Sequence, residues 1–368
     1  MGVIRFLLAL SVAGAHGHPF YILSFIGGDI AVQAFFVISG FYMAMIIGSY
    51  KSPYQFWISR YLRLYPTYII CAFLVLVFRR GIGHYISDLS TLPTSAITFF
   101  TFTNLTMFLQ DLTKFLRITD GSLRFVKLFG DNSEQIPHVL LLPQGWTLGI
   151  EISFYMLAPF ILNRSVRIII FIIFLSVMLR IGLIEYCCSE YRWTDQFFPT
   201  QIAVFLLGSL AYKLYESKKR LEKSTDYFSI GIFLMFLLFL ADFNNLPIDY
   251  KTRGWLFLLA LTFSINSIFH LTKNSKLDNF VGALSYPVYV SQFFVLFYLR
   301  PLLDPHVTDG GLFNSLLFYG TLTVFSAALY FLVEKPVNAF RHRLKTAAVL
   351  KGTDVDQPRN LAKSVTVE

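Results

Sequence analysis

The sequence has few charged residues and few cysteines. Only 14% of its 368 residues are Asp, Glu, Lys or Arg, whereas a soluble globular domain carries about 25%. The three cysteines, Cys71, Cys187 and Cys188, are too few for a disulfide framework, and no CxxC or Cys/His spacing suggests a metal site. No internal repeat is visible either. These absences argue against a disulfide-stapled secreted domain, a zinc module and a repeat protein, and we expect the cysteines to be structural.

Hydrophobic and aromatic residues take the place of charge. They make up 55% and 17% of the chain, and the mean hydropathy is +0.59. The 40 Phe and 20 Tyr residues suit lipid-facing surfaces and the belts at membrane interfaces. The net charge of +9 comes from short basic runs between apolar segments, where Lys and Arg act as topology signals. We therefore expect an integral membrane protein with no nucleic-acid partner.

Ten apolar stretches approach the length of about 20 residues that a helix needs to cross a bilayer. They lie at about 3–20, 28–48, 62–78, 147–163, 166–184, 199–215, 227–242, 254–271, 280–299 and 312–333. A more polar stretch, 92–110, is an eleventh candidate. If it spanned, the basic run at 218–223 would lie outside, whereas without it that run and the basic segments at 51–63 and 341–345 lie inside. The positive-inside rule therefore favours ten spans with both termini in the cytoplasm.

We predict an all-α fold, namely a polytopic membrane helix bundle over 1–336 followed by a cytoplasmic polar tail over 337–368. The segment 79–145 then lies on the outer side and is expected to be re-entrant or periplasmic, because irregular backbone at membrane depth must line a protein cavity. Arg5, the apolar run 6–12 and the small residues 13–15 also resemble a secretory signal. We interpret this stretch as the first span, since it extends far enough to form one.

Ionisable residues inside predicted spans are costly and usually face a functional interior. Arg5 and His16 are three helical turns apart and share one face, with a rise of roughly 16 Å between them. Glu151 lies about 7 Å inside its helix, close to the predicted level of His16. A neutral imidazole can accept a hydroxyl proton, and a carboxylate can orient it. An interfacial histidine and a carboxylate satisfied by tyrosine or backbone donors are the alternatives.

A second candidate group is Arg60 and Arg63, at the cytoplasmic start of the third predicted span. Residues three apart on a helix point the same way, and guanidinium groups bind phosphate through paired hydrogen bonds. The pair would suit a phosphorylated cytosolic ligand. Ordinary topology anchors that touch lipid headgroups would show the same spacing.

Six short motifs occur in one order along the chain. They are Arg5-x10-His16, the run Ala34-Phe35-Phe36-Val37-Ile38-Ser39-Gly40-Phe41, Arg60-x2-Arg63-x2-Pro66, Trp146-x4-Glu151-x2-Phe154-Tyr155, Ser285-Tyr286-Pro287-Val288-Tyr289 and Glu334-Lys335-Pro336. Together they resemble the acyltransferase-3 family of bacterial membrane O-acyltransferases, which modify lipopolysaccharide, capsule, exopolysaccharide, peptidoglycan and nodulation-factor sugars. The resemblance implies a ten-helix domain that moves an acyl group, usually acetyl, from cytosolic coenzyme A to an acceptor outside.

The resemblance also implies roles for individual residues. The family's essential histidine falls on His16, its motif glutamate on Glu151, and its arginines on Arg5, Arg60 and Arg63, which we expect to bind acyl-CoA. Ser39, Trp146 and Tyr155 stand in the same motifs and are expected to contact substrate.

Two positions depart from the family pattern. Gln33 stands where many members have an acidic residue, and Gln292 where many have a histidine. Many members also append a soluble esterase-like domain, whereas only a short tail follows Pro336. We therefore expect transfer to finish within the membrane domain or on a separate partner.

The predicted function is that of a membrane-bound, acyl-CoA-dependent O-acyltransferase of the bacterial inner membrane. Acyl-CoA, with acetyl-CoA expected, would be a co-substrate, with no tightly bound cofactor and no metal. The acceptor would be a hydroxyl of a cell-envelope or exported polysaccharide, membrane lipid would be a further partner, and a homo-oligomer is compatible with the sequence.

Two other functions fit less well. A transporter or flippase for a lipid-linked saccharide would also carry intramembrane charges, but such folds usually show repeats and broken helices. A scaffold for an envelope assembly complex would leave the burial of His16 and Glu151 unexplained.

Overall fold

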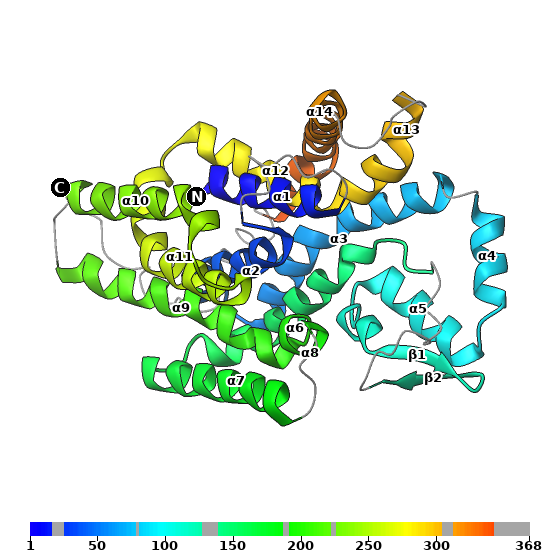
Figure 1. The fold of residues 1–368 in the computed structure, drawn as a ribbon, viewed down its shortest axis with the longest axis horizontal. Helices are drawn as coiled ribbons and strands as arrows, with labels where there is room; N and C mark the ends of the chain where they lie inside the picture. Colours follow the sequence, from blue (N-terminus) through cyan, green and yellow to red (C-terminus); the bar gives the residue numbers. More distant parts are fainter. Residues whose placement is uncertain are drawn as a thin grey trace, which may run out of the picture.

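A computed structural model describes residues 1–16, 26–78, 81–126, 139–186, 191–221, 226–303 and 312–341. The described part is a helical bundle with one two-stranded hairpin (Figure 1). Its longer helices are α1 (Gly2–His16), α2 (Gly28–Ile46), α3 (Pro53–Phe78), α6 (Trp146–Ile161), α7 (Val166–Tyr186), α9 (Phe198–Leu221), α10 (Asp226–Ala241), α11 (Tyr250–Thr272), α12 (Lys276–Phe294) and α14 (Leu312–Leu329). The shorter elements are α4 (Ile82–Ser90), α5 (Thr94–Thr106), α8 (Tyr191–Asp195), α13 (Arg300–Leu303), β1 (Leu116–Thr119) and β2 (Ser122–Phe125).

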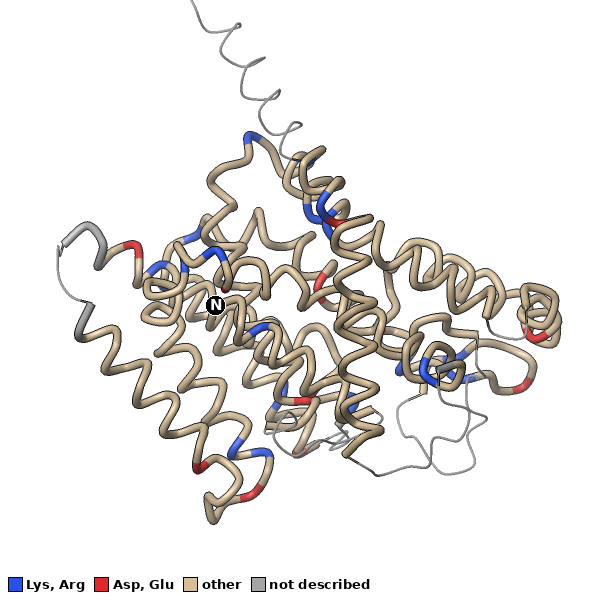
Figure 2. Tube along the Cα trace, turned by 90° about the horizontal axis from the view of Figure 1, so that it is seen from above, with Lys and Arg blue, Asp and Glu red and all other residues tan. Residues whose placement is uncertain are grey.

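Each of the ten predicted apolar stretches is occupied by a helix. Within the described residues, 6 helical segments are long and apolar enough to cross a membrane: Gly28–Ser49, Pro53–Phe78, Val166–Tyr186, Tyr250–Thr272, Lys276–Leu302 and Leu312–Arg341. Charged residues are sparse along the helices and gather towards their ends (Figure 2). The protein is therefore a helical membrane bundle, and the number of ten crossings stays a prediction.

The polar stretch 92–110 forms α5, which has only 13 residues. At 1.5 Å per residue such a helix is about 20 Å long, too short for a hydrocarbon core of about 30 Å. With α4 and the hairpin it forms a lobe at the end of the bundle away from the N-terminus (Figure 1). The lobe is held by the amide of Asn104, which donates to Val139 O at 2.7 Å and accepts from Leu141 N at 3.2 Å.

Glycines set the closest approach between the central helices α2 and α9. A Cβ atom on Gly40 would lie 1.8 Å from the carbonyl oxygen of Phe205, and one on Gly208 would lie 1.8 Å from that of Val37. Small residues at helix contacts let backbones approach in membranes. Because the two helices lie so close, Ser209 Oγ can donate a hydrogen bond to Gly40 O at 3.0 Å.

The start of α1 is fixed to the start of α12 by Asp278. Its carboxylate accepts the backbone N–H groups of Gly2 at 2.7 Å and Val3 at 2.9 Å. These groups have no partner within their own helix. Since α1 and α12 pack side by side from this point, the two helices present their residues to the same interior space.

A buried polar network joins α2, α7 and α8. Arg180 forms an ion pair with Asp195 at 2.5 Å, and Gln33 donates to the same carboxylate oxygen. The Arg180 guanidinium also lies 4.7 Å from the centre of the Trp255 ring on α11. Gln33, which departs from the family's acidic pattern, is thus a partner of an acidic residue supplied by another helix.

The last helical segment continues beyond the boundary predicted at 336. After α14 the π-helical turn η6 (Tyr330–Glu334) leads into helix that reaches Arg341. The remainder of the predicted tail, 342–368, lies outside the described residues, as do Cys187 and Cys188.

Candidate active site

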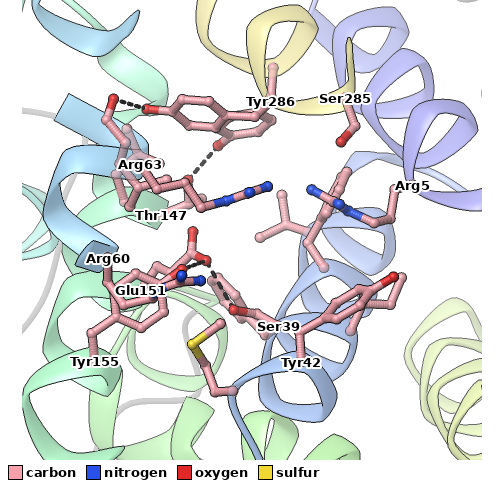
Figure 3. Close-up of a pocket in the computed structure, with 18 of the residues that line it drawn as sticks. Arg5, Ser39, Tyr42, Arg60, Arg63, Thr147, Glu151, Tyr155, Ser285 and Tyr286 are labelled. Atoms are coloured by element: carbon pink, nitrogen blue, oxygen red, sulfur yellow. Dashed lines mark hydrogen bonds between the residues drawn. The ribbon is translucent and has the colours of Figure 1, made fainter. Parts of the chain in front are cut away.

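A cavity of about 340 Å³ lies between α1, α2, α3, α6 and α12. Its polar lining includes Arg5, Ser39, Tyr42, Arg60, Arg63, Thr147, Glu151, Tyr155, Ser285, Tyr286 and Tyr289 (Figure 3). Its apolar lining includes Val32, Phe35, Phe36, Ile38, Met43, Ile46, Leu64 and Leu148. The side where α3 begins is called here the Arg60 end, and the opposite side, where α6 begins, the Tyr289 end.

Arginines dominate the charge of this cavity. The guanidinium groups of Arg5 and Arg63 extend toward one another from α1 and α3 (Figure 3). Within the described part of the chain, neither has a carboxylate within ion-pair distance or a hydrogen-bond partner, although the Arg5 guanidinium lies 5.9 Å from the centre of the Tyr42 ring. Arg60, one turn before Arg63 on α3, is buried. The buried carboxylate of Glu334 acts on Arg5 and Arg63 through its electrostatic field but forms no ion pair with either. Like charges held this close without a paired carboxylate favour an anionic ligand.

Glu151 is the acidic residue in the described lining. Its carboxylate accepts a hydrogen bond from Ser39 Oγ at 2.9 Å and another from the hydroxyl of Tyr155. Tyr155 also stacks edge-on to Phe56, and its carbonyl oxygen accepts from Trp57 Nε1 at 3.0 Å. The carboxylate is therefore held in place by α2 and by its own helix, facing the arginines.

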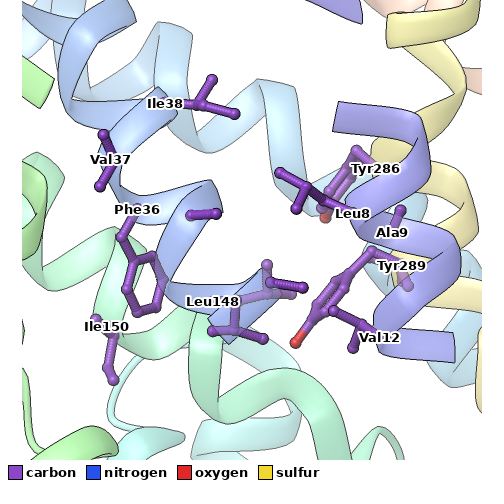
Figure 4. Packing of buried hydrophobic residues seen from close by; sticks show 14 of the residues in the cluster. Leu8, Ala9, Val12, Phe36, Val37, Ile38, Leu148, Ile150, Tyr286 and Tyr289 are labelled. Atoms are coloured by element: carbon purple, nitrogen blue, oxygen red, sulfur yellow. The ribbon is translucent and has the colours of Figure 1, made fainter. Parts of the chain in front are cut away.

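The cavity ends at a contact between α12 and α6. The hydroxyl groups of Tyr289 and Thr147 lie 2.6 Å apart, and the Tyr289 hydroxyl donates to Gln144 O at 3.1 Å. Gln144 in turn donates through Nε2 to Val290 O at 2.7 Å. Tyr289 reaches between Val12 of α1 and Leu148 of α6 (Figure 4). Polar bonds and apolar packing together close the Tyr289 end.

His16 lies beyond this closure, at the end of α1. Its side chain is exposed, with Nδ1 2.9 Å from Val12 O and its ring 4.8 Å from that of Phe293. Gln292 lies beside the imidazole. This glutamine, which stands where many members of the family have a second histidine, is therefore a neighbour of His16. His16 is one turn farther along α1 than Val12, just as Phe293 is one turn farther along α12 than Tyr289.

The sequence predicts that His16 and Glu151 lie within hydrogen-bond reach, directly or through one water, and among the described residues they make no direct hydrogen bond. Within the described residues Glu151 bonds to Ser39 and Tyr155, and His16 contacts Val12. The depth estimate explains the difference: Thr147, at the start of α6, is level with Tyr289, and Glu151 is a full turn deeper. His16 and Glu151 therefore lie on opposite sides of the Tyr289 closure.

Six of the eight predicted site residues share one cavity: Arg5, Ser39, Arg60, Arg63, Glu151 and Tyr155. His16 lies outside its lining, as does Trp146, which is half-buried against the hydrophobic core at the start of α6. Their chemical roles stay predictions.

The sequence reasoning assigned no role to Tyr42, Thr147, Ser285, Tyr286 or Tyr289. The motif from Ser285 to Tyr289 was visible, and its two tyrosines could have been assigned to an interior face because they are a turn apart. Tyr286 donates to Leu64 O at 2.6 Å, which fixes α12 against α3.

Comparison with known protein families identifies this domain. A family model described as an acyltransferase domain, acyltransferase-3, matches residues 1–335. The chain belongs to the acyltransferase-3 family. The match includes every helix that contributes to the cavity, so this membrane bundle is an acyltransferase domain. No solved structure matches the chain. Among the described residues no group of three or more His, Cys, Asp or Glu side chains could hold a metal ion.

Proposed function

We propose that this acyltransferase moves an acyl group, acetyl by expectation, from cytosolic acyl-CoA to a hydroxyl of a cell-envelope or exported carbohydrate. The observation that carries the proposal is the cavity lined by Arg5, Arg60 and Arg63 and balanced by Glu151 alone among its described residues. The lining carries three guanidinium groups and one carboxylate, a charge of +2. The Glu334 carboxylate behind the lining, which interacts with Arg5 and Arg63, reduces this excess without cancelling it, so the site favours an anionic ligand. Coenzyme A carries a diphosphate and a further phosphate on its nucleotide.

The shape of the cavity suits a donor that enters lengthwise. Its lining includes Ile46 and Arg60 from the Arg60 end and Val32, Phe35 and Tyr289 from the Tyr289 end. In the predicted topology the Arg60 end faces the cytoplasm. The phosphates would then be held near the arginines, and the pantetheine arm would carry the thioester toward the Tyr289 end.

The proposed chemistry needs one proton acceptor. The acceptor oxygen attacks the thioester carbonyl, the bond from carbon to sulfur breaks, and the hydroxyl proton passes to the neutral imidazole of His16. The leaving thiolate takes up this proton from the imidazolium, directly or through water, which gives coenzyme A and restores neutral His16, and the acyl ester is the other product. Because Tyr289 separates the cavity from His16, the contact between Tyr289 and Thr147 must open during turnover. Direct transfer and a covalent acyl intermediate are both compatible with this arrangement.

The test combines binding and product analysis. Protein in lipid nanodiscs should bind coenzyme A, and Arg63→Gln should weaken that binding by about tenfold or more, since a hydrogen bond to a charged group contributes about 1.5–3 kcal/mol. Arg164→Gln, a change at an exposed residue, is the matched control. Mass spectrometry of envelope and secreted polysaccharides from cells with and without the gene should show loss of one acyl substituent. Unchanged polysaccharides, with no coenzyme A binding by the wild type, would overturn the proposal.

A further inference from the structure

A second group of basic side chains lies at the Arg60 end of the cavity. Arg60 Nη2 donates to the Tyr50 hydroxyl at 3.0 Å, and Arg341 Nη2 donates to Ser59 Oγ at 3.2 Å. Ser59 Oγ is also 3.5 Å from Arg60 Nη2 and 3.0 Å from the Tyr50 hydroxyl. One serine oxygen thus contacts two guanidinium groups that come from helices far apart in the sequence.

These two arginines have no acidic partner among the described residues. Arg341 Nη1 donates to the neutral amide oxygen of Asn338 at 2.6 Å. The buried Glu334 interacts with Arg341 electrostatically, but no carboxylate of the described chain lies within ion-pair distance of Arg60 or Arg341. The Nε atoms of both are buried without a hydrogen-bond partner, and Arg60 is only 8% exposed. Burying a charge without a partner is costly. Two such charges beside one hydroxyl indicate that an anion completes the group.

We propose that Arg60 and Arg341 form a binding site for a phosphate group of the donor, separate from the facing pair Arg5 and Arg63. This inference rests on the proposed function. A phosphate can accept hydrogen bonds from two guanidinium groups at once, and the hydroxyls of Tyr50 and Ser59 add neutral donors. The long helical segment that carries Arg341 would then belong to the donor site, whereas the position of Arg341 in the sequence predicts only a topology signal.

The arrangement explains why two groups of arginines line one cavity. Arg60 and Arg63 are three residues apart on α3, a rise of about 4.5 Å, and Arg63 extends toward Arg5 (Figure 3). A donor with phosphates at separate places along its length could occupy both groups together. A lipid headgroup could supply the same phosphate chemistry to Arg341, and the experiment must distinguish the two sources.

The test compares Arg341→Gln with Lys335→Gln. Both changes remove one positive charge from the same helical segment, but Lys335 is exposed and lies over the Phe331 ring at 5.6 Å. Coenzyme A is titrated into each protein in nanodiscs of zwitterionic lipid. Arg341→Gln should weaken binding by about tenfold or more, while Lys335→Gln stays within about twofold of the wild type. Arg341→Lys should recover only part of the affinity, because an ammonium cannot bind phosphate bidentately.

The outcomes separate this inference from the proposed function. If the wild type binds coenzyme A and Arg341→Gln binds it equally well, the inference is wrong and the proposed function stands. If the wild type does not bind coenzyme A, the proposed function itself fails. If Arg341→Gln lowers only the retention of anionic lipid, measured by native mass spectrometry, the site belongs to lipid and the inference is again wrong. Should Arg341→Gln not fold, Ser59→Ala gives the same test, with an expected loss of about threefold.

Discussion

The hydroxyl groups of Tyr289 and Thr147 lie 2.6 Å apart and join α12 to α6 at the end of the arginine-lined cavity. On one side of this contact are Glu151 and the arginines, and on the other is His16. A donor in the cavity and an acceptor beside His16 would therefore be separated by two side chains. The separation has a chemical advantage, since it keeps the thioester away from water until the acceptor has bound.

The first prediction concerns this barrier. Tyr289→Phe and Thr147→Val each remove the hydrogen bond without changing much volume, and each should raise acyl-CoA hydrolysis in the absence of acceptor by about twofold to tenfold, the worth of one neutral hydrogen bond. The double variant should raise hydrolysis by less than the product of the two single effects, because both changes remove the bond between the two hydroxyls, while each also removes its own bond to Gln144 O. Release of free thiol measures the reaction. Tyr319→Phe, a buried tyrosine outside the cavity lining, is the control. Rates that multiply in the double variant would argue against a shared barrier.

The second prediction concerns His16 as the base. His16→Ala should lower acyl transfer by about 10²–10⁴-fold, the usual contribution of general acid–base catalysis. Coenzyme A affinity should not change, because His16 does not line the cavity proposed to bind the donor. Turnover and binding are measured on the same preparation, with His270→Ala on α11 as the control. Transfer that stays within tenfold of the wild type would remove His16 from the reaction.

The third prediction concerns Glu151, for which the structure suggests a different role from the one predicted from the sequence. Because Glu151 faces arginines and does not contact His16, its carboxylate opposes an anionic donor. Glu151→Gln keeps an oxygen that can accept from Ser39 and Tyr155, but raises the charge of the lining from +2 to +3. Coenzyme A should bind several-fold more tightly while transfer falls by about tenfold. Glu216→Gln, at an exposed position, should change neither. Weaker coenzyme A binding in Glu151→Gln would show that the carboxylate mainly positions the arginines.

The sequence was sufficient for the helices and for most of the cavity. Apolar length located all ten stretches, because the bilayer requires it of any span, and the spacing of Arg60 and Arg63 indicated a common direction. The relative depths of His16 and Glu151 in the bundle did not follow from the sequence. A rise of 1.5 Å per residue gives position along one helix only, and the relative height of α1 and α6 depends on contacts such as that between Tyr289 and Thr147.

Partnerships between distant helices could not be predicted either. The sequence shows Gln33 as a departure from an acidic pattern, yet the acid it binds is Asp195, more than 160 residues away. The sequence position of Arg341 indicated only a basic residue beside the cytoplasmic end of a span. Its contact with Ser59 joins residues 282 positions apart. Both are side-chain contacts set by tertiary packing, which no local spacing encodes.

The fourth prediction concerns Asp111, in the short helical turn η2 (Asp111–Lys114) that packs on α6. A Cβ atom on Gly149 would lie 2.8 Å from Asp111 Oδ1, and this oxygen is buried with no hydrogen-bond partner. Burial raises the pKa of the Asp111 carboxyl from 3.8 to about 6. Above pH 6 the folded protein therefore carries an unfavourable buried charge, which lowers its free energy of unfolding. This loss decreases as the pH falls from about 6 to about 4, and below that the carboxyl is protonated in both the folded and the unfolded protein.

Asp111→Asn should consequently stabilise the protein at pH 7.5 by about 1–3 kcal/mol, since a shift of about two pKa units corresponds to roughly 3 kcal/mol at most. The gain should vanish near pH 4. Thermal unfolding in detergent between pH 4 and 8 measures it, with Asp120→Asn in the exposed turn of the hairpin as the control. Burial outweighs the backbone N–H groups that favour the charged carboxylate of Asp111, so the charge is a net cost in the resting protein. Destabilisation by Asp111→Asn at pH 7.5 would mean that the carboxylate binds a cation or a further donor group there. A stabilised variant that transfers acyl groups normally would instead place Asp111 outside the reaction.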